Sequence, residues 1–565
     1  MLHSILVLAG AFEGVGLMRP DEARRSLRRQ ILIVGMLFAF IALIYLVFNV
    51  SRFERLTDVN ALDYAQIARH LKRGEGFTTS FIKPLGLVYE TSIENHHDLT
   101  YPPVHIGLTS VIMRALGEND RAVSHSSGLA FLLTIPVLFT LAVRLFDWRT
   151  AVLGTLLFGT HLANLGYSVS GLEASLLTLL VTGMILLLHC AASSEKYELV
   201  WVGAAGIAMG LVYLTKYIWI GALIPAIAYL IIMKPERRFA RVGIFVAVLV
   251  IVAAPWLFRN YSLTGNPFFT LRWHELLGQT RAHPANTIYR EYSEDAPSFL
   301  AFAFNNPKAV FVKLRAGLTG LYRSFHELGG LFITPFFVVG ILVRLGDDRL
   351  ERLRYLLYGM IVVISVVLAF FIAAPRLIAP MGGFVTILAV AFFWRLLDAR
   401  TQSLEPRPRL RWLALSIALL LVLHIHPLVT AITPDEPADV TGETPLEQAM
   451  TQLQQTVDGP IVTDVPWTVA WMADRDAVWI TQSEADFRRM EEKVGRFNWL
   501  MLSPTVARMA GAERLEIWAD TWVRAQQGDA EMLGFTIAAR LGDGRWILMR
   551  RQASGGGAGD DATGR

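Results

Sequence analysis

The stretch RRSLRRQILIVGMLFAFIALIYLVFNV, residues 24–50, decides what kind of protein this chain forms. Its apolar part, Ile31–Val50, contains no charged residue. At about 1.5 Å per residue, a helix of this length crosses a hydrocarbon core of ~30 Å. Arginines 24, 25, 28 and 29 precede it, and such a basic flank marks the cytoplasmic side of a span. We therefore predict a first transmembrane helix with a cytoplasmic N-terminal segment, residues 1–30.

Apolar runs of similar length recur along most of the chain. Ten more are found near residues 127–144, 151–168, 172–190, 199–215, 217–233, 242–258, 328–343, 355–374, 377–394 and 412–432. Hydrophobic residues make up 53% of the 565 residues and charged ones 18%, whereas about a quarter of a soluble protein is charged. The prediction is an α-helical polytopic membrane protein with about eleven transmembrane helices in a domain spanning residues 31–432.

Composition also excludes several classes of function. Cys190 is the only cysteine and lies in an apolar run, which argues against a disulfide scaffold, a zinc ribbon and Cys-His catalysis. The net charge is +4, and no Lys/Arg stretch is interleaved with aromatic residues. Nucleic acid is therefore not an expected partner.

The first residues do not read as a secretory signal. Met1–Leu17 has neither a basic residue ahead of it nor a small-x-small cleavage site after it. Met18 directly precedes the arginine-rich flank, so translation from Met18 is an alternative start.

The phase of the basic residues sets the expected topology. The apolar stretch Val104–Ala115 would cover only about 18 Å as a helix, so we expect it to lie along the membrane surface. The basic clusters near 234–241, 344–354 and 400–411 then face the cytoplasm. This phase places the segments 51–126 and 259–327 and the chain from 433 onward outside, with the C-terminus out.

Beyond residue 433 the composition becomes that of a soluble domain. Strand-like pieces (460–464, 477–480, 499–502, 535–540 and 545–549) alternate with helical ones (484–494 and 513–526). The pattern predicts a small extracytoplasmic α/β domain over residues 433–552. Residues 553–565 are rich in Gly and Asp and are expected to be disordered.

Two basic residues break the positive-inside pattern at the outer turns. On this topology Lys216 and Arg376 lie at the same membrane face, which suggests that they neutralise a fixed anion there. A lipid phosphate is the natural anion at a membrane surface. The alternative is that both side chains reach out to lipid headgroups.

The first outer segment holds several candidate site residues. Spacing predicts an amphipathic helix over residues 62–72 that lies on the membrane, with Asp63 at its start. Asp63 is a candidate base, although a carboxylate at a helix start is often a cap. Further on, His96 and His97 stand among carboxylates, either as metal ligands or as part of a solvated loop.

Polar residues also mark two other outer junctions. Glu173 stands at the edge of an apolar run, where an unpaired charge is costly to bury. Arg259 and Asn260 emerge at the head of the second outer segment. Glu173 and Lys216 are expected on the same face as Asp63.

These motifs together resemble the GT-C superfamily of integral membrane glycosyltransferases, in the branch of the protein O-mannosyltransferases and lipid A aminoarabinose transferases. The residues that carry the resemblance are Asp63-Tyr-Ala-Gln-Ile-Ala-Arg69, Gly74-Glu-Gly-Phe77, Tyr101-Pro-Pro103, Leu214-Thr-Lys216, Pro255-Trp-Leu-Phe-Arg-Asn-Tyr261 and Pro375-Arg-Leu-Ile-Ala-Pro380. The stretch Val462–Trp471 resembles the periplasmic domain of bacterial members.

The resemblance implies an enzyme of the bacterial inner membrane that moves a sugar from a polyprenyl-phosphate donor to a glycan, lipid or protein acceptor outside, with inversion at the anomeric carbon. It implies a general base in the first outer segment, for which Asp63 is the first candidate. Many relatives have an Asp-Glu pair there, whereas Tyr64 follows Asp63, so Asp58 is a second candidate. Glu173 would be a second carboxylate, and Lys216, Arg259 and Arg376 would hold the donor phosphate. The remaining candidate site residues are Tyr64, His96, His97, Tyr101 and Asn260. Some relatives use a divalent metal and others none, and both remain open.

Two other functions fit a membrane protein with these charges. A transporter or flippase of lipid-linked sugars would carry charged residues near span centres, whereas the unusual charges here gather at one face. A non-catalytic envelope-assembly protein would use its outer domain to recruit partners.

The charge phase yields a topological prediction. A reporter that is active only outside the cytoplasm should work when fused after residue 95, 290 or 470 and fail after residue 236 or 350. Reporter activity after residue 236 would mean that this loop faces outward, and it would contradict both the topology inferred from charge and the outer placement of Lys216 and Arg376.

Overall fold

The computed structural model describes residues 20–234, 236–292, 299–344, 348–433, 444–529 and 531–552. The alternative start at Met18 and the tail 553–565 lie outside these residues. Two compact units form the chain. The helical unit contains Met1–Ala61, Tyr101–Phe269 and Val310–Pro437, and the sheet unit contains Leu62–Thr100, Thr270–Ala309 and Ala438–Arg565.

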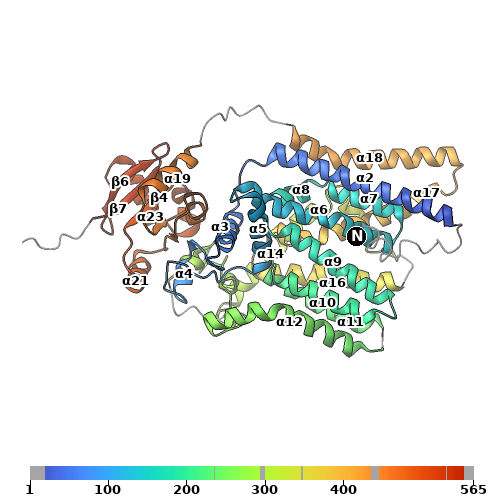
Figure 1. Cartoon of the computed structure of the whole chain (residues 1–565), viewed down its shortest axis with the longest axis horizontal. Coiled ribbons are helices and arrows are strands. Elements are labelled where there is room, and N and C mark those ends of the chain that lie inside the picture. Colours follow the sequence, from blue (N-terminus) through green and yellow to red (C-terminus); the bar gives the residue numbers. More distant parts are fainter. Residues whose placement is uncertain are drawn as a thin grey trace, which may run out of the picture. The chain divides into compact units, whose positions relative to one another are not determined.

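Helices that lie alongside one another build the helical unit (Figure 1). They are α2 (Pro20–Arg52), α5 (Pro103–Leu116), α6 (Asp120–Leu145), α7 (Trp148–Gly159), α8 (Leu162–Val169), α9 (Ala174–Ser193), α10 (Glu198–Tyr213), α11 (Leu223–Met233), α12 (Arg238–Thr264), most of α14 (Pro307–Ser324), α15 (Thr334–Gly340), α16 (Asp348–Phe370), α17 (Gly382–Thr401) and α18 (Pro406–Ile432). Short 3₁₀ turns connect some of them: η2 (Tyr217–Ala222), η5 (Phe325–Leu328), η6 (Pro375–Leu377) and η7 (Ala379–Met381).

Within the described residues, seven helices are long and apolar enough to cross a membrane, against the eleven spans expected. They are Ile31–Arg52, Asp120–Leu145, Ala174–Ser193, Arg238–Thr264, Asp348–Phe370, Ala379–Thr401 and Pro406–Ile432. The multi-pass helical architecture is thus confirmed, and the number of full-length spans is lower. The stretch Val104–Ala115, which we expected not to span, is the 14-residue helix α5.

The four other expected spans are short or broken, for local reasons. The run 151–168 is interrupted between α7 and α8, where Asn164 donates to the Phe158 carbonyl at 3.0 Å and so satisfies a group that the break exposes. The run 199–215 is α10, with 16 residues. The run 217–233 starts as η2 before it becomes α11. In 328–343, Gly330 has a φ of 88°, which holds the chain out of helix until α15.

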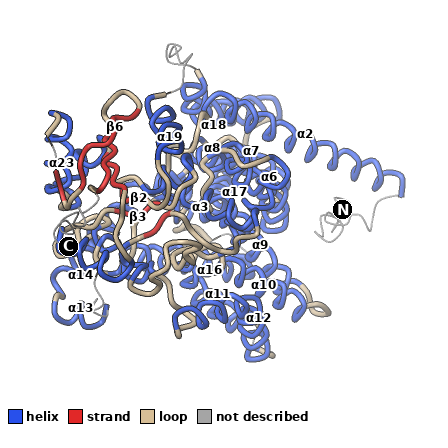
Figure 2. The backbone as a smooth tube through the Cα atoms, turned by 60° about the vertical axis from the view of Figure 1, so that its left-hand side comes forward, coloured by secondary structure: helices blue, strands red, loops and turns tan. Residues whose placement is uncertain are grey.

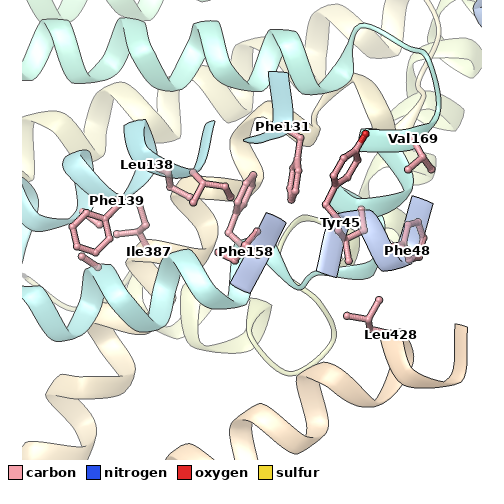
Figure 3. Close-up of a cluster of buried hydrophobic side chains, with 14 residues drawn as sticks. Tyr45, Phe48, Phe131, Leu138, Phe139, Phe158, Val169, Ile387 and Leu428 are labelled. Carbon is pink, nitrogen blue, oxygen red and sulfur yellow. The ribbon is translucent and has the colours of Figure 1, made fainter. Parts of the chain in front are cut away.

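The main apolar core of the helical unit joins six helices (Figure 3). Ile41, Tyr45 and Phe48 of α2 pack against residues of α6, α7, α8, α17 and α18. The rings of Phe131 and Phe158 stack at 6.2 Å between centroids. Since α2 is the first predicted span, this core anchors it to later helices of the same unit, up to α18.

Glycines let α10 approach α12 closely. A Cβ added at Gly206 would lie 2.7 Å from the backbone oxygen of Phe245, and one at Gly210 would lie 2.8 Å from Val252. Two glycines four residues apart form the small-residue face by which helices pack in a membrane. The close approach therefore depends on the missing side chains.

A mixed seven-stranded sheet forms the centre of the sheet unit (Figure 2). Its order is β1-β3-β2-β4-β7-β6-β5, with β1, β3, β2 and β4 parallel and the remaining neighbours antiparallel. The strands are β1 (Phe81–Ile82), β2 (Ile461–Thr463), β3 (Ala477–Trp479), β4 (Trp499–Leu502), β5 (Glu531–Met532), β6 (Phe535–Leu541) and β7 (Trp546–Arg551). The expected α/β pattern beyond residue 444 is confirmed.

The helical elements of the sheet unit come from all three of its chain segments. They are most of α3 (Val59–Arg73), α4 (Pro84–Leu87), η3 (Leu271–Leu276), η4 (Thr287–Arg290), α13 (Phe299–Asn305), α19 (Pro445–Thr456), α20 (Pro466–Thr468), the π-helical turn η8 (Val469–Ala473), α21 (Glu484–Val494), α22 (Pro504–Glu513) and α23 (Glu516–Gln527).

Strand β1 comes from the first outer segment, which changes the expected domain boundaries. Phe81 pairs with Ala477 and Ile82 with Val478. Residues 62–100 and 270–309 belong to the same compact unit as the C-terminal domain, whereas we had assigned them to the transmembrane domain. Strand pairing between segments distant in sequence leaves no signal in either segment alone.

The surface helix expected over residues 62–72 requires a correction. A helix forms there, but α3 begins at Val59, so Asp63 lies in its second turn. Residues 61–70 are all buried, and Asp63 itself is fully buried. Protein covers both the apolar and the polar side of this helix, so it has no apolar face left to lie on a membrane surface.

The glycine face of α10 predicts opposite effects at two helical glycines. Gly206→Ala should lower the thermal unfolding temperature of the purified protein, because the new methyl group meets backbone of α12. Gly183→Ala in α9 is the matched control, since a Cβ there meets nothing within 4 Å. The control should be neutral or stabilising by up to about 1 kcal/mol. Equal changes in unfolding temperature for the two variants would contradict the conclusion that the close contact between α10 and α12 requires Gly206.

Candidate functional site

A buried ion pair lies at the centre of the candidate site in the helical unit. Lys216 Nζ is 2.5 Å from Glu173 Oε1, and the two side chains are 7% and 2% exposed. Glu173 immediately precedes α9, and Lys216 follows α10. The sequence placed Glu173 and Lys216 on the same face, and in the structure the two side chains form an ion pair.

Charge keeps the buried Glu173 ionised. Burial raises the pKa of its carboxyl, but Lys216 and Arg376 outweigh burial and bring this pKa below its ordinary value. Arg376, in η6, therefore acts on the same carboxylate as Lys216. A carboxylate in this position is a fixed negative charge at neutral pH.

A second, more accessible ion pair joins Asp58 to Arg376. Arg376 Nη1 lies 2.9 Å from Asp58 Oδ2, and the side chains are 25% and 33% exposed. The other oxygen of Asp58 accepts from the Asn60 backbone N–H at 2.8 Å, and Tyr101 donates to the Asn60 side chain at 3.3 Å. Asp58 thus stands at the start of α3, where the exposed carboxylate and guanidinium can contact a ligand.

His105 supports the loop before Glu173. Its buried ring nitrogen Nε2 lies 3.0 Å from the Gly171 carbonyl. Gly171 has a φ of 72°, and a Cβ on it would come within 2.9 Å of Val123, so glycine is required there. The sequence analysis missed His105, although it lies two residues after the Tyr101-Pro-Pro103 motif.

Arg259 and Asn260 lie in the last two turns of α12, which continues to Thr264. The Arg259 guanidinium lies over the Trp256 ring, 4.5 Å from its centroid, and donates to the Asn260 side chain at 3.4 Å. Trp256 in turn donates to the hydroxyl of Tyr217 at 2.6 Å. Because Tyr217 follows Lys216 in sequence, these bonds connect α12 to the segment that carries Lys216.

The predicted candidates Asp63, Tyr64, His96 and His97 belong to the sheet unit. Asp63 Oδ2 lies 3.1 Å from Lys83 Nζ, and its Oδ1 accepts from Gln66 at 2.9 Å. Tyr64 is buried. The sequence analysis missed Lys83, which follows β1, because its partner lies twenty residues earlier in the chain.

His96 and His97 have separate partners in the same unit. The buried His96 places Nδ1 2.8 Å from the Ser92 carbonyl, and burial lowers its pKa. His97 Nδ1 lies 2.8 Å from Glu90 Oε1. In the described ranges no three or more His, Cys, Asp or Glu side chains gather as a metal site would require.

The fold and family comparisons agree with the resemblance predicted from the motifs. Residues 100–258 match the family model of dolichyl-phosphate-mannose-protein mannosyltransferase. Glu173 and Lys216 lie inside this match, and Asp58 and Arg376 lie outside it. The chain has the fold of the GT-C membrane glycosyltransferases and is a multi-pass membrane protein.

Two solved structures illustrate the likeness. ArnT from Cupriavidus metallidurans bound to undecaprenyl phosphate aligns with a TM-score of 0.53 and 16% identity over 92% of this chain and 98% of that chain. The oligosaccharyltransferase AglB from Archaeoglobus fulgidus, in complex with an inhibitory peptide and a dolichol-phosphate, aligns with a TM-score of 0.54 and 12% identity over 86% of this chain and 71% of that chain. No curated protein matches the chain in sequence.

The two ion pairs predict different costs of removing a cation. The sequence places Lys216 at an outer turn, and the structure shows that its side chain is buried on Glu173. Lys216→Met should therefore destabilise the protein by about 3–5 kcal/mol, because it strands a buried charge. Arg376→Met, whose pair is partly exposed, should cost about 1 kcal/mol or less.

Thermal unfolding in one detergent provides the comparison. The double variant Lys216→Met with Glu173→Gln serves as the control, because it removes both charges. It should recover part of the lost stability. A Lys216→Met protein as stable as Arg376→Met would contradict the burial argument.

Proposed function

We propose that the protein is an inverting glycosyltransferase that moves a sugar from a polyprenyl-phosphate donor to an acceptor at the extracytoplasmic face. We place it in the inner membrane of a bacterium, with the N-terminus inside and the C-terminus outside. The observation that carries the proposal is the partly exposed Asp58–Arg376 pair, together with the buried Glu173–Lys216 pair whose carboxylate Arg376 also influences. The GT-C fold supports it, as do the undecaprenyl phosphate bound to ArnT and the dolichol-phosphate in complex with AglB.

The cations supply the electrostatic part of the reaction. As the bond from sugar C1 to the phosphate oxygen breaks, negative charge develops on the leaving polyprenyl phosphate. Arg376, Lys216 and Arg259 are the candidate residues to stabilise this charge. Preorganised cations in a site of low dielectric stabilise a developing charge more than water does.

A carboxylate supplies the proton transfer. The acceptor hydroxyl or amine must lose a proton as it attacks C1, and Asp58 is the candidate that receives it. One displacement from the face opposite the phosphate inverts the anomeric centre. Glu173 is the second carboxylate of the site, and its burial favours a role in holding Lys216 rather than in contacting the acceptor.

The structure supports Asp58 over Asp63 as the base. The Asp58 side chain is one-third exposed, so an acceptor can reach it. Asp63 is fully buried, and both of its oxygens have partners in Lys83 and Gln66. We therefore reverse the order of the two candidates that the sequence suggested.

Transfer from a synthetic polyprenyl-phosphate sugar by the purified protein tests this assignment. Asp58→Asn should lower turnover ~10²-fold or more with nearly unchanged donor affinity, because the amide keeps the cap on Asn60 but does not accept a proton. The matched control neutralises the other pair, as Asp63→Asn with Lys83→Met, and should retain most turnover. Loss of turnover in the folded control together with an active Asp58→Asn enzyme would return the base to Asp63.

The acceptor can be identified by an experiment that assumes no particular acceptor. Mass spectrometry of envelope lipids, glycans and proteins from cells with and without the gene should show one class that gains a sugar only when the protein is present. Redistribution of the lipid-linked sugar across the membrane without a modified acceptor would indicate a flippase. Unchanged lipids and glycans would favour an assembly protein.

A further inference from the structure

Helix α3 carries a stripe of polar side chains that the sheet unit buries. Asp63, Gln66 and His70 recur every three or four residues, so they share one side of the helix, and all three are buried. Gln66 accepts from the Ser80 backbone N–H at 2.9 Å and donates to Thr79 at 2.7 Å. These bonds fix the rotation of α3 about its own axis, since a turn by one residue (~100°) would break them.

The C-terminal part of α3 is held by a cation, Arg69, that is almost fully buried. Its guanidinium donates to the Trp471 carbonyl at 2.9 Å and the Ala470 carbonyl at 2.5 Å, and lies 2.8 Å from Asp474. The Trp471 ring lies 5.0 Å away. A planar fork of N–H groups satisfies two carbonyls and a carboxylate at once, which a lysine cannot reproduce.

The segment that receives Arg69 has an unusual backbone. Residues Val469–Ala473 form a π-helical turn, and the next residue, Asp474, is left-handed with a φ of 52°. Such turns and such non-glycine residues cost energy and occur mostly at functional sites. Here they end a helix so that its last carbonyls and the Asp474 carboxylate face Arg69. The first three residues of the turn, Val469–Trp471, end the stretch Val462–Trp471 that the sequence singled out.

We propose that this turn is a receptor for α3 and that Arg69 is a positioning residue for sugar transfer. The inference rests on the proposed function. The C-terminal domain then has a defined task, which is to hold the helix that starts directly after Asp58 and contains Asp63.

Arg69 and the proposed base lie at the two ends of the same helix, so a loss of the Arg69 contacts can shift the base. The proposed base, Asp58, directly precedes α3 and lies eleven residues before Arg69, or ~16 Å along the helix axis. A misplacement of a catalytic group by about 1 Å can lower turnover ~10²-fold. Loosening α3 should therefore slow the reaction while the residues that bind the donor phosphate stay unchanged.

Two measurements on the full-length protein in detergent test the proposal. Arg69→Gln should increase hydrogen exchange in residues 59–73 and lower turnover about tenfold or more, with donor affinity within about twofold of the unmodified protein. Arg69→Lys keeps the charge, and its hydrogen exchange and turnover should lie between those of Arg69→Gln and the unmodified protein. Arg73→Gln is the matched control, because Arg73 pairs with the same Asp474 but is 35% exposed, and it should change little.

Each result decides a different point. Unchanged exchange over residues 59–73 in Arg69→Gln would overturn the hold on α3. Faster exchange with unchanged turnover would overturn the positioning role. If Arg69→Gln does not fold, Arg69→Lys carries the same two measurements. An unmodified protein that transfers no sugar would refute the proposed function, and the exchange data would still decide whether the turn holds α3.

Discussion

A charge inside an apolar surround needs a partner of opposite sign, and this constraint fixes helix α10 at both ends. Glu198, its first residue, pairs with Arg241 of α12 at 2.6 Å. Lys216, three residues after the last residue of α10, pairs with Glu173 before α9 at 2.5 Å. The glycines between the two pairs let α10 contact α12 directly. The helix that delivers Lys216 to the candidate site is thus held by two ion pairs and close packing.

The sheet unit applies the same rule to its outer segments. Arg69 of the first segment and Arg290 of the second are both buried cations that reach the C-terminal domain. Arg290 pairs with Glu513 at 2.6 Å, donates to the Ile480 carbonyl at 3.2 Å and lies 4.0 Å over the Trp479 ring. Because each arginine is satisfied by carbonyls and carboxylates of that domain, the two outer segments and the C-terminal domain fold as one unit.

The candidate site combines a fixed part with an adaptable part. Glu173 and Lys216 are buried and hold each other, whereas Asp58 and Arg376 are partly exposed. The four charges sum to zero, so Lys216 and Arg376, two of the three cations that the sequence assigned to a lipid phosphate, already have carboxylate partners in the chain. A phosphate that binds there joins existing ion pairs. Arg376 is suited to such sharing, because its guanidinium has several N–H donors.

The sequence by itself determined the membrane class, the α/β character of the C-terminal domain and the residues that do not fit their surroundings. Hydropathy and periodicity are local, so the apolar runs, the strands β2, β3, β4, β6 and β7 and the helix 484–494 could be predicted. The anomalous charges Glu173, Lys216 and Arg376 were also visible, because a charge in an apolar context stands out without knowledge of its partner.

Only the tertiary structure decided which charges meet and how accessible they are. Asp58 and Asp63 are five residues apart, yet one is partly exposed on Arg376 and the other is sealed against Lys83. Burial depends on segments far away in sequence, and β1 reaches the C-terminal sheet across nearly four hundred residues. The sequence therefore named the candidate carboxylates, and the choice between them required the contacts that distant residues make.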